Sequence, residues 1–291
     1  MNESLTGMKT LSVVLPAKNE AVAVGGTVAR VLSAFSDAEV IVVNDGSIDD
    51  TAQVAEAAGA KVISHPYCKG NGAAIKTGAR AAVGDVIVFM DADGQHDPSD
   101  ISRLLSKLEE GYDLVVGARD RASQASVGRS LANLFYNRLA TYMTGHRIDD
   151  LTSGFRAVRA EKFREFLYLL PNGFSYPTTS TMAFFRAGYS VAYIPIRAAK
   201  RIGKSHIHLI KDGVRFLLII FKIGTLYSPL KLFAPVASAM FLLATGWYAH
   251  TLIDQGRFTN MSTLLYTGSV ITFLMGLISE QITALMYKRH E

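Results

Sequence analysis

Short apolar runs alternate with amphipathic runs over the first 120 residues of the chain. The short runs are rich in Val and Ile and contain few polar residues, as expected of strands that are covered on both faces. We predict strands at 11–15, 40–43, 62–64, 86–90 and 114–116. The runs between them predict helices at 21–34, 51–58, 71–83 and 100–110. This alternation predicts an α/β fold with a mostly parallel sheet, in which ligands bind at the carboxyl ends of the strands.

Two apolar runs near the C-terminus, at 232–253 and 258–279, contain no charged residue. Each reaches the about 20 residues that a membrane-spanning helix needs, so we predict a hairpin of two transmembrane helices. A pair of buried core helices is the alternative. Basic residues flank the hairpin, at Lys231 before it and at 288–289 after it, whereas the link between the runs contains only Arg257. The positive-inside rule therefore predicts a multi-pass protein of the cell membrane, with its large N-terminal domain and both termini in the cytoplasm.

The stretch 205–230 combines apolar residues at helical spacing with Lys211, Arg215 and Lys222 at other positions. This pattern predicts an amphipathic helix in the headgroup layer of a lipid bilayer; a soluble surface helix packed on the domain is the alternative. No nucleic-acid-reading motif accompanies the basic residues, so anionic lipid explains them better and we expect no nucleic acid as a partner. We therefore divide the chain into an α/β domain at 1–204, an interface segment at 205–230 and a transmembrane region at 231–291, with spans at about 232–253 and 258–287.

Composition narrows the class of protein further. Hydrophobic residues make up 49% of the chain and the net charge is +5, which argues against a disordered or collagen-like protein. Cys68 is the single cysteine, and no Cys/His group has the spacing of a zinc site. These counts exclude a disulfide-stapled secreted fold and a structural zinc module.

Polar residues collect where three of the predicted strands end. These clusters lie at 16–20, 44–47 and 91–96. In an extended chain, Asp91, Asp93 and Gln95 alternate onto one face. Two carboxylates and an amide oxygen are hard ligands suited to Mg²⁺ or Mn²⁺; a cap or a solvated turn is the alternative. An EF-hand is excluded, because His96 stands where that loop requires Gly and Ser102 where it requires Glu.

The glycine-rich stretch 69–78 resembles a phosphate-binding loop without matching one. Ile75 stands where a P-loop requires Gly and where the dinucleotide fingerprint requires a small residue. The stretch therefore predicts a flexible turn, in which Lys69 opens a helix near a diphosphate group.

The order of these motifs resembles glycosyltransferase family 2, with its GT-A fold, over about residues 10–205. The matching patterns are Pro16-x-x-Asn19-Glu20, Asp45-Gly46-Ser47 with Asp49 and Thr51, the 91–96 run, 116–119 and 150–156. The last of these, together with 201–205, is similar to the dolichol-phosphate mannose synthase branch and its bacterial polyprenyl-phosphate relatives. One departure is Lys18, which stands where the branch often has an aromatic residue.

The resemblance implies a role for each matching residue. Asp91, Asp93 and Gln95 would hold Mg²⁺ or Mn²⁺ on the diphosphate of a nucleotide-sugar donor. The donor itself would be held by Pro16, Ala17, Glu20, Asp45, Asp49, Lys69, Gly70, Arg201 and Lys204. The phosphate of the acceptor would be held by Arg119, Arg129 and Asn133. The shared use of Arg favours bidentate recognition of an anion.

The implied reaction is an inverting transfer from a UDP- or GDP-sugar to a polyprenyl phosphate, either undecaprenyl or dolichyl phosphate, which gives a β-linked product. The metal and cationic side chains would stabilise the charge that builds up on the leaving nucleotide. A phosphate monoester has a second pKa of about 6, so a strong general base is unnecessary. A carboxylate would mainly orient the acceptor or accept a residual proton, with Asp150 as the first candidate and Asp149 as the second. The catalytic candidates are therefore Asp93, Arg119, Arg129 and Asp150.

The same resemblance implies further partners: the lipid bilayer, other copies of the chain in a homo-oligomer, and downstream a flippase or a transferase that uses the lipid-linked sugar. A processive polysaccharide synthase is disfavoured, because its Gln-x-x-Arg-Trp motif is missing and the only tryptophan, Trp247, lies in the first apolar run. A nucleotidyltransferase would not need a membrane hairpin. Two alternatives stay open: a family 2 enzyme that acts on another lipid or glycan acceptor, and a non-catalytic membrane scaffold that binds nucleotide-sugars.

Overall fold

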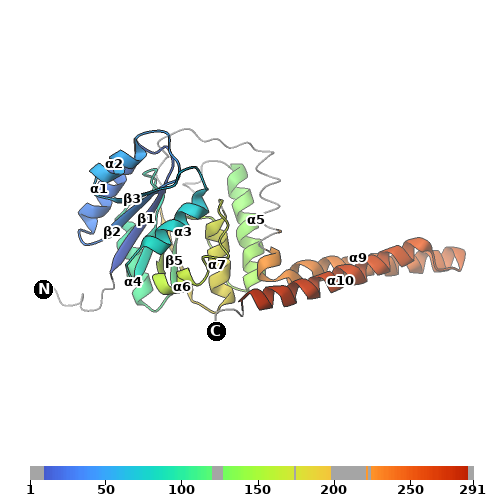
Figure 1. The fold of residues 1–291 in the computed structure, drawn as a ribbon. Helices are drawn as coiled ribbons and strands as arrows, with labels where there is room; N and C mark the ends of the chain where they lie inside the picture. The colour runs from blue at the N-terminus through green and yellow to red at the C-terminus, as the bar shows by residue number, and fades with distance from the viewer. Residues whose placement is uncertain (1–9, 120–126, 174, 198–220, 222–223, 288–291) are drawn as a thin grey trace. The chain divides into compact units, whose positions relative to one another are not determined.

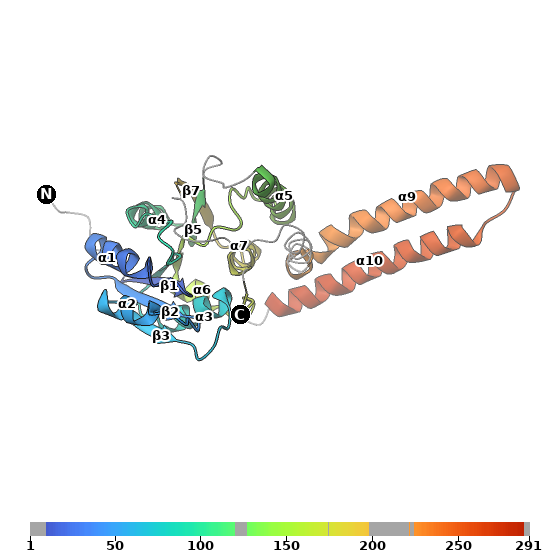
Figure 2. The ribbon, with the colours of Figure 1, turned by 90° about the horizontal axis from the view of Figure 1, so that it is seen from above.

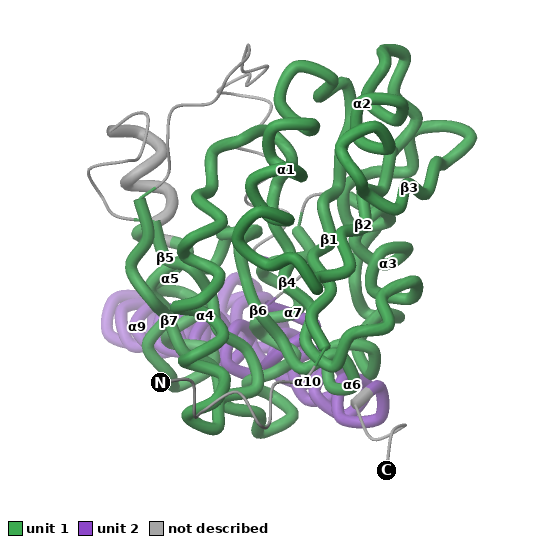
Figure 3. The backbone as a smooth tube through the Cα atoms, turned by 90° about the vertical axis from the view of Figure 1, so that its left-hand side faces the viewer, with its two compact units in different colours: residues 1–207 green, residues 208–291 purple. Residues whose placement is uncertain are grey.

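The computed structural model describes residues 10–119, 127–173, 175–197, 221 and 224–287. The chain forms two compact units, residues 1–207 and residues 208–291, which Figure 3 distinguishes by colour.

The first unit is built on a seven-stranded sheet in the order β3-β2-β1-β4-β6-β5-β7 (Figure 1). The strands are β1 (Leu11–Ala17), β2 (Glu39–Asn44), β3 (Lys61–Ser64), β4 (Val86–Phe89), β5 (Leu114–Arg119), β6 (Arg156–Arg159) and β7 (Val191–Ile196). β6 is antiparallel to both of its neighbours, and every other pair is parallel. The prediction of a mostly parallel sheet is confirmed.

Helices cover both faces of this sheet. They are α1 (Val24–Ala34), α2 (Thr51–Ala57), α3 (Asn71–Ala81), α4 (Asp100–Glu109), α5 (Val127–Thr144), α6 (Ala160–Arg164) and α7 (Tyr176–Arg186). Successive side chains of a strand point to opposite faces, so Val13 and Leu15 of β1 pack in one core with α1, α2 and α4. Val14, between them, faces α3 on the other side. The parallel part of the sheet is therefore buried on both faces, which explains its nearly continuous apolar strands.

The five strands and four helices predicted for the first 120 residues are all present, with ends shifted by at most three residues. The later elements β6, β7, α6 and α7 were not predicted. β6 is only four residues long and begins and ends with Arg, so it carries no strand-like pattern. β7 contains Pro195 and lies at the edge of the sheet, which is where a strand tolerates Pro.

The second unit is a hairpin of α9 (Pro229–Gln255) and α10 (Asn260–Tyr287), which run side by side (Figure 2). Small residues face the partner helix at intervals of seven, as in a coiled coil. The buried ones are Ala237, Ala244 and Thr251 in α9, and Ser262, Ser269 and Thr283 in α10. Ser269 Oγ donates to the carbonyl of Ala237 at 2.8 Å. The seam of the hairpin is therefore made of small and weakly polar side chains.

Large apolar side chains lie on the outside of the hairpin. Leu242, Ile253 and Leu264 are 70%, 84% and 66% exposed. Both helices are long and apolar enough to cross a membrane, and this pattern is the inverse of a water-soluble helix pair. Glu280 accepts a hydrogen bond from Leu230 N at 3.2 Å, so this carboxylate faces the first turn of α9. The alternative of two buried core helices does not fit this unit. The predicted amphipathic helix lies mostly outside the described residues.

Candidate active site

The loops that follow β1 and β2 are fastened to each other at the carboxyl edge of the sheet. Asn19 N donates to Ser47 Oγ at 2.9 Å, and Ile48 N donates to Asn19 Oδ1 at 3.0 Å. Asn19 has a φ of 55°, in the left-handed region that Asn adopts more readily than most residues. Two of the three polar clusters predicted at strand ends therefore lie together.

Four candidate donor-binding residues lie in this pair of loops or at the end of the strand before them: Pro16, Ala17, Glu20 and Asp49. Pro16 and Ala17 end β1. Glu20 N donates to Thr51 Oγ1 at 2.9 Å. Asp49 accepts from Thr51 Oγ1 and, at 3.3 Å, from the backbone N–H of Ala21. The candidates from the first loop are thus tied to those from the second through Thr51 and Asp49.

A buried carboxylate, Asp45, holds the segment that leads into α3. We call Asp45, His65, Cys68, Lys69 and Gly70 the Asp45 cluster. Asp45 Oδ1 lies 2.7 Å from His65 Nδ1 and accepts from Lys69 N at 2.8 Å. Its Oδ2 accepts from Gly70 N at 2.8 Å and from the Cys68 thiol at 3.2 Å. Burial alone would raise the pKa of Asp45, but these hydrogen bonds outweigh it and hold the pKa below its usual value.

The glycine-rich start of α3 packs backbone to backbone on the segment 171–173. Gly72 N donates to the carbonyl of Gly173 at 3.1 Å, and Ala73 N donates to that of Asn172 at 3.0 Å. A Cβ added to Gly72 would lie 2.0 Å from the carbonyl oxygen of Pro171. The expectation of a flexible turn is therefore corrected, because the glycines permit a close contact that uses the first N–H groups of the helix. The placement of Lys69 and Gly70 near a diphosphate stays a prediction.

The candidate metal ligands follow β4 directly. The Asp91 side chain is 39% exposed and its Oδ2 lies 3.7 Å from His96 Nε2. Asp93 is buried, and its Oδ1 accepts from Gln95 N at 3.1 Å. His96 is stacked on the ring of Phe155, with 4.9 Å between ring centroids. Asp91, Asp93 and Gln95 therefore lie within one short loop at the carboxyl edge of the sheet.

A divalent cation fits this donor set only with help from a substrate. Among the residues that the structure describes, no group of three His, Cys, Asp or Glu side chains could hold a metal alone. Mg²⁺ is commonly held by one or two carboxylates together with substrate phosphates and water. Asp91 and Asp93, both at the end of β4, meet that requirement.

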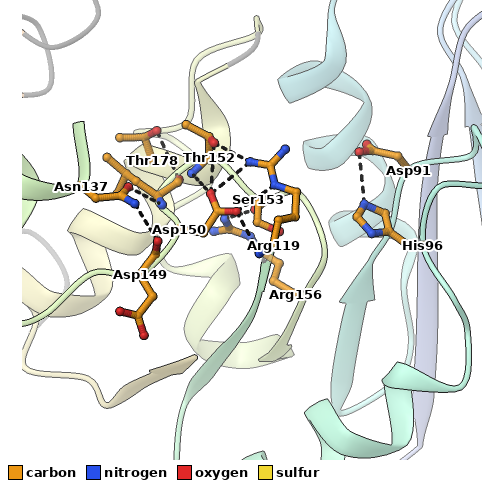
Figure 4. A network of polar contacts seen from close by, with 11 residues as sticks. Asp91, His96, Arg119, Asn137, Asp149, Asp150, Thr152, Ser153, Arg156 and Thr178 are labelled. Carbon is orange, nitrogen blue, oxygen red and sulfur yellow. Dashed lines mark hydrogen bonds and ion pairs between the residues drawn. The ribbon is translucent and has the colours of Figure 1, made fainter. Parts of the chain in front are cut away.

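Arg119, the last residue of β5, forms a bidentate ion pair with Asp150 (Figure 4). We call Arg119, Asp150 and Thr152 the Arg119 cluster. Arg119 Nε and Nη2 donate to Asp150 Oδ2 and Oδ1 at 2.8 and 3.1 Å, and Nη2 also donates to Thr152 Oγ1 at 2.6 Å. Burial would raise the pKa of Asp150, but the hydrogen bonds and charge of Arg119 keep the pKa below its usual value. The structure thus joins a predicted phosphate ligand to a predicted acceptor-orienting carboxylate.

The remaining site predictions lie outside what the structure describes. Arg129 and Asn133 belong to α5, but their side chains are outside the described residues, as are Arg201 and Lys204 altogether. Asp149 is described: its Oδ1 accepts from Arg147 Nε at 2.8 Å, away from the Arg119 cluster.

Two regions of the sequence match known families. Residues 12–167 match the description "Glycosyl transferase family 2", and residues 228–285 match "GtrB C-terminal hairpin". The first match spans more than half of the chain. The chain belongs to glycosyl transferase family 2. The hairpin match and the exposed apolar faces of α9 and α10 further indicate a membrane protein.

Curated relatives of this family 2 glycosyltransferase include two proteins of Haloferax volcanii. Glycosyltransferase AglJ is 29% identical over 78% of this chain and 76% of its own length. A dolichyl-phosphate hexose transferase is 28% identical over 70% and 89%. The undecaprenyl-phosphate 4-deoxy-4-formamido-L-arabinose transferase of Klebsiella pneumoniae is 35% identical, but the match covers 52% of this chain and 49% of that protein. These relatives confirm the resemblance to the polyprenyl-phosphate branch of the family.

Solved structures support the same fold. Glucosyl-3-phosphoglycerate synthase from Mycobacterium tuberculosis, in complex with Mn²⁺, UDP and phosphoglyceric acid, superposes with a TM-score of 0.60. It is 26% identical and covers 74% of this glycosyltransferase and 78% of its own chain. The same enzyme in complex with Mn²⁺ and UDP-glucose gives a TM-score of 0.58. The predicted GT-A fold is confirmed.

Arg156 closes the 150–156 pattern of this glycosyltransferase, but the sequence alone predicted no role for it. Arg156 is fully buried, and its Nη1 donates to the carbonyl of Pro177 at 2.9 Å and to Ser180 Oγ at 2.8 Å. Its Nη2 donates to the carbonyl of Ser153. A buried Arg requires buried acceptors, but two of them, Pro177 and Ser180, lie on α7, which was not predicted.

Proposed function

We propose that this chain transfers a sugar from a UDP- or GDP-sugar to a polyprenyl phosphate at the cytoplasmic face of the membrane. The product is a β-linked polyprenyl-phosphate sugar. One observation carries the proposal: a family 2 domain with a carboxylate pair after β4 shares its chain with a hairpin of the GtrB type. Two relatives are named dolichyl-phosphate hexose transferase and undecaprenyl-phosphate 4-deoxy-4-formamido-L-arabinose transferase, which supports such an acceptor.

Asp91, Asp93 and Gln95 are the proposed ligands of Mg²⁺ or Mn²⁺ on the donor diphosphate. The neighbouring solved enzyme binds Mn²⁺ and UDP, which supports a divalent cation here. When bound, that cation stabilises the negative charge of the leaving diphosphate. The proposed donor-binding residues are Pro16, Ala17, Glu20, Asp45, Asp49, Lys69, Gly70, Arg201 and Lys204. Asp45 would act by holding Lys69 and Gly70 in place, since its oxygens bond to their N–H groups.

The acceptor phosphate is the proposed nucleophile. One of its oxygens forms a bond to the anomeric carbon from the face opposite the donor diphosphate, while the bond from that carbon to the diphosphate breaks. The configuration inverts, and the nucleoside diphosphate leaves with the bonding electron pair. Arg119, Arg129 and Asn133 would hold the acceptor phosphate. Its second pKa is about 6, so the attacking oxygen is largely deprotonated near neutral pH.

The proposed place of the reaction follows from the acceptor. A long isoprenoid stays in the bilayer, so its phosphate is available only at the headgroup layer. The hairpin of α9 and α10, together with the 205–230 segment, would keep the catalytic domain at that layer. We place the domain and both termini in the cytoplasm, because the basic residues flank the hairpin on both sides.

A panel of donors tests the proposal. The full chain in detergent would be incubated with UDP- and GDP-linked hexoses and N-acetylhexosamines, together with undecaprenyl or dolichyl phosphate and Mg²⁺ or Mn²⁺. Mass spectrometry should detect a polyprenyl-phosphate sugar with at least one donor. Asp93→Ala should reduce that product by roughly three orders of magnitude, because a cation supplies several kcal/mol to such transition states. Product formed only on another lipid or glycan would contradict the proposed acceptor, and binding of donors without any transfer would indicate a non-catalytic scaffold.

A further inference from the structure

The carboxylate of Asp150 is fully occupied by its own protein. Its Oδ2 accepts from Arg119 Nε at 2.8 Å and from Arg119 N at 3.2 Å. Its Oδ1 accepts from Arg119 Nη2 at 3.1 Å, from Thr152 N at 3.0 Å and from Thr152 Oγ1 at 3.1 Å. A carboxylate offers about four lone-pair sites. Little acceptor capacity is therefore left to orient a substrate or to take a proton.

The same contacts leave one end of Arg119 available. Nε and Nη2 point to Asp150 and Thr152, while Nη1 makes no hydrogen bond to the described part of the chain. The Arg119 side chain is 30% exposed, in contrast to 5% for Asp150. The charge of Asp91 also acts on Arg119, so this guanidinium lies on the side of the site where the candidate metal ligands are. Figure 4 shows it between Asp150 and Asp91.

The loop that carries Asp150 is itself held from two sides. Leu151 N donates to Asn137 Oδ1 of α5 at 3.1 Å, and Asn137 Nδ2 donates to the carbonyl of Asp149 at 2.6 Å. Behind the loop, the buried Arg156 donates to the carbonyl of Ser153. A side chain whose support is rigid holds its partner in one orientation. Asp150 therefore has the properties of a fixed anchor.

We propose that Asp150 is a positioning residue, which aims Nη1 of Arg119 at the acceptor phosphate and takes no proton in the reaction. This inference rests on the proposed function. A guanidinium fixed on two of its nitrogens loses little freedom when the third binds an anion. The low pKa of Asp150 suits an anchor that stays ionised beside Arg119.

Asp150→Asn separates this role from that of a base. The full chain would be assayed with saturating donor and varied polyprenyl phosphate. We expect the acceptor KM to rise roughly 10- to 100-fold, as expected when one partner of a buried charge pair is replaced. The donor KM should change less than about twofold, and the pH profile of kcat should keep its shape. Loss of the acid limb of that profile, with an unchanged acceptor KM, would show a base and overturn the proposal.

Asp113→Asn is a matched control for a general loosening of β5. Asp113 precedes β5, whereas Arg119 is the last residue of that strand. Like Asp150, Asp113 accepts from a cationic side chain, a backbone N–H and a hydroxyl: Lys162 Nζ at 2.7 Å, Ser190 N at 2.9 Å and Ser190 Oγ at 2.9 Å. We expect Asp113→Asn to lower the melting temperature and to leave the acceptor KM unchanged. An equal rise in the acceptor KM would overturn the proposal.

Two further variants extend the test, and the first of them also serves if Asp150→Asn does not fold. Thr152→Val removes the hydroxyl that bridges Arg119 and Asp150 but keeps both charges, so it should raise the acceptor KM about threefold. Arg119→Lys should raise it at least as much as Asp150→Asn, and the double variant should be no worse than the worse single one. Additive effects would overturn the proposal. If the unaltered chain makes no polyprenyl-phosphate sugar, the proposed function itself fails; if it does and Asp150→Asn leaves the acceptor KM unchanged, only the positioning role fails.

Discussion

The Asp45 cluster and the Arg119 cluster each contain a central carboxylate, but the two carboxylates hold different parts of the protein in place. Each centres on a buried carboxylate whose hydrogen bonds keep its pKa low. Asp45 bonds mainly to neutral donors and fixes a stretch of backbone at Lys69 and Gly70. Asp150 bonds to a cation and fixes a side chain. The Asp45 cluster fixes the backbone conformation, and the Arg119 cluster fixes the orientation of a guanidinium group.

The difference extends to what each region tolerates. Next to the Asp45 cluster, the backbones of α3 and of the segment 171–173 are in direct contact, so a side chain added at Gly72 would clash with backbone atoms. Around the Arg119 cluster, side chains make the contacts, and Gly154 has its nearest neighbour at 3.3 Å from a would-be Cβ, the hydroxyl of Tyr176. The first region should be sensitive to volume and the second to charge.

The largest expected effect on stability is that of Gly72→Ala. The new Cβ would lie 2.0 Å from the carbonyl oxygen of Pro171 and 2.8 Å from that of Gly173. Backbone on both sides must move, so we expect a loss of about 3 kcal/mol or failure to fold. Urea unfolding of the full chain in detergent, followed by circular dichroism, measures this. Gly154→Ala is the matched control and should cost less than about 1 kcal/mol. Equal losses would show that the two regions do not differ in tightness.

This contrast also explains which parts of the site could be predicted from the sequence. Asp45 and Asp91 stand out because they follow apolar strands, and the topology of a parallel sheet brings such ends together. Asp150 was found in another way, from the resemblance that the 150–156 pattern carries. The contacts between distant parts of the chain could not be predicted in either way. Gly72 contacts a segment about a hundred residues later in the chain, and no pattern in the neighbouring sequence predicts this contact. The glycine-rich run therefore resembled a phosphate loop, although Gly72 within it serves packing.

The elements of the fold also differ in how far their own sequence predicts them. The strands of the first 120 residues could be predicted because burial on both faces makes them continuously apolar. β6 is short and ends in Arg at both sides, and the long row of Ser and Thr in α7 resembles no amphipathic helix. Those hydroxyls bond to carbonyls of their own helix and to Arg156. Arg156 of β6 and the polar groups of α7 are hydrogen-bonded to each other. Neither segment therefore has the hydrophobic pattern of a strand or of an amphipathic helix when its sequence is considered alone.

Effects on substrate binding come next, and that of Asp45→Asn falls on the donor. The amide retains an acceptor oxygen but turns an N–H₂ group toward donors that Asp45 now satisfies, at His65, Lys69 or Gly70. One donor left unsatisfied costs about 1–3 kcal/mol, and the loop it holds would loosen. We expect the donor KM to rise about tenfold while the acceptor KM stays within about twofold. Steady-state kinetics with each substrate varied in turn measures both.

Asp150→Asn should give the opposite pattern, with the acceptor KM raised and the donor KM retained. The two variants thus form a reciprocal test on one chain. If both raise the same KM, then the division of the site between a loop that holds the donor and a side chain that holds the acceptor is wrong.

The smallest expected effect is on the stability of the first unit in acid. The folded pKa values of Asp45 and Asp150 lie below that of an unfolded Asp, about 3.9. The folded state therefore binds fewer protons than the unfolded state in this range, and stability falls as the pH drops from about 5 through the folded pKa values. Each group contributes at most about 1.4 kcal/mol per pH unit to that slope. Asp45→Asn and Asp150→Asn should each flatten the fall of melting temperature between pH 5 and pH 3. A variant whose curve stays parallel to that of the unaltered chain would show that its carboxylate has no depressed pKa, and hence that its hydrogen bonds do not hold the charged form.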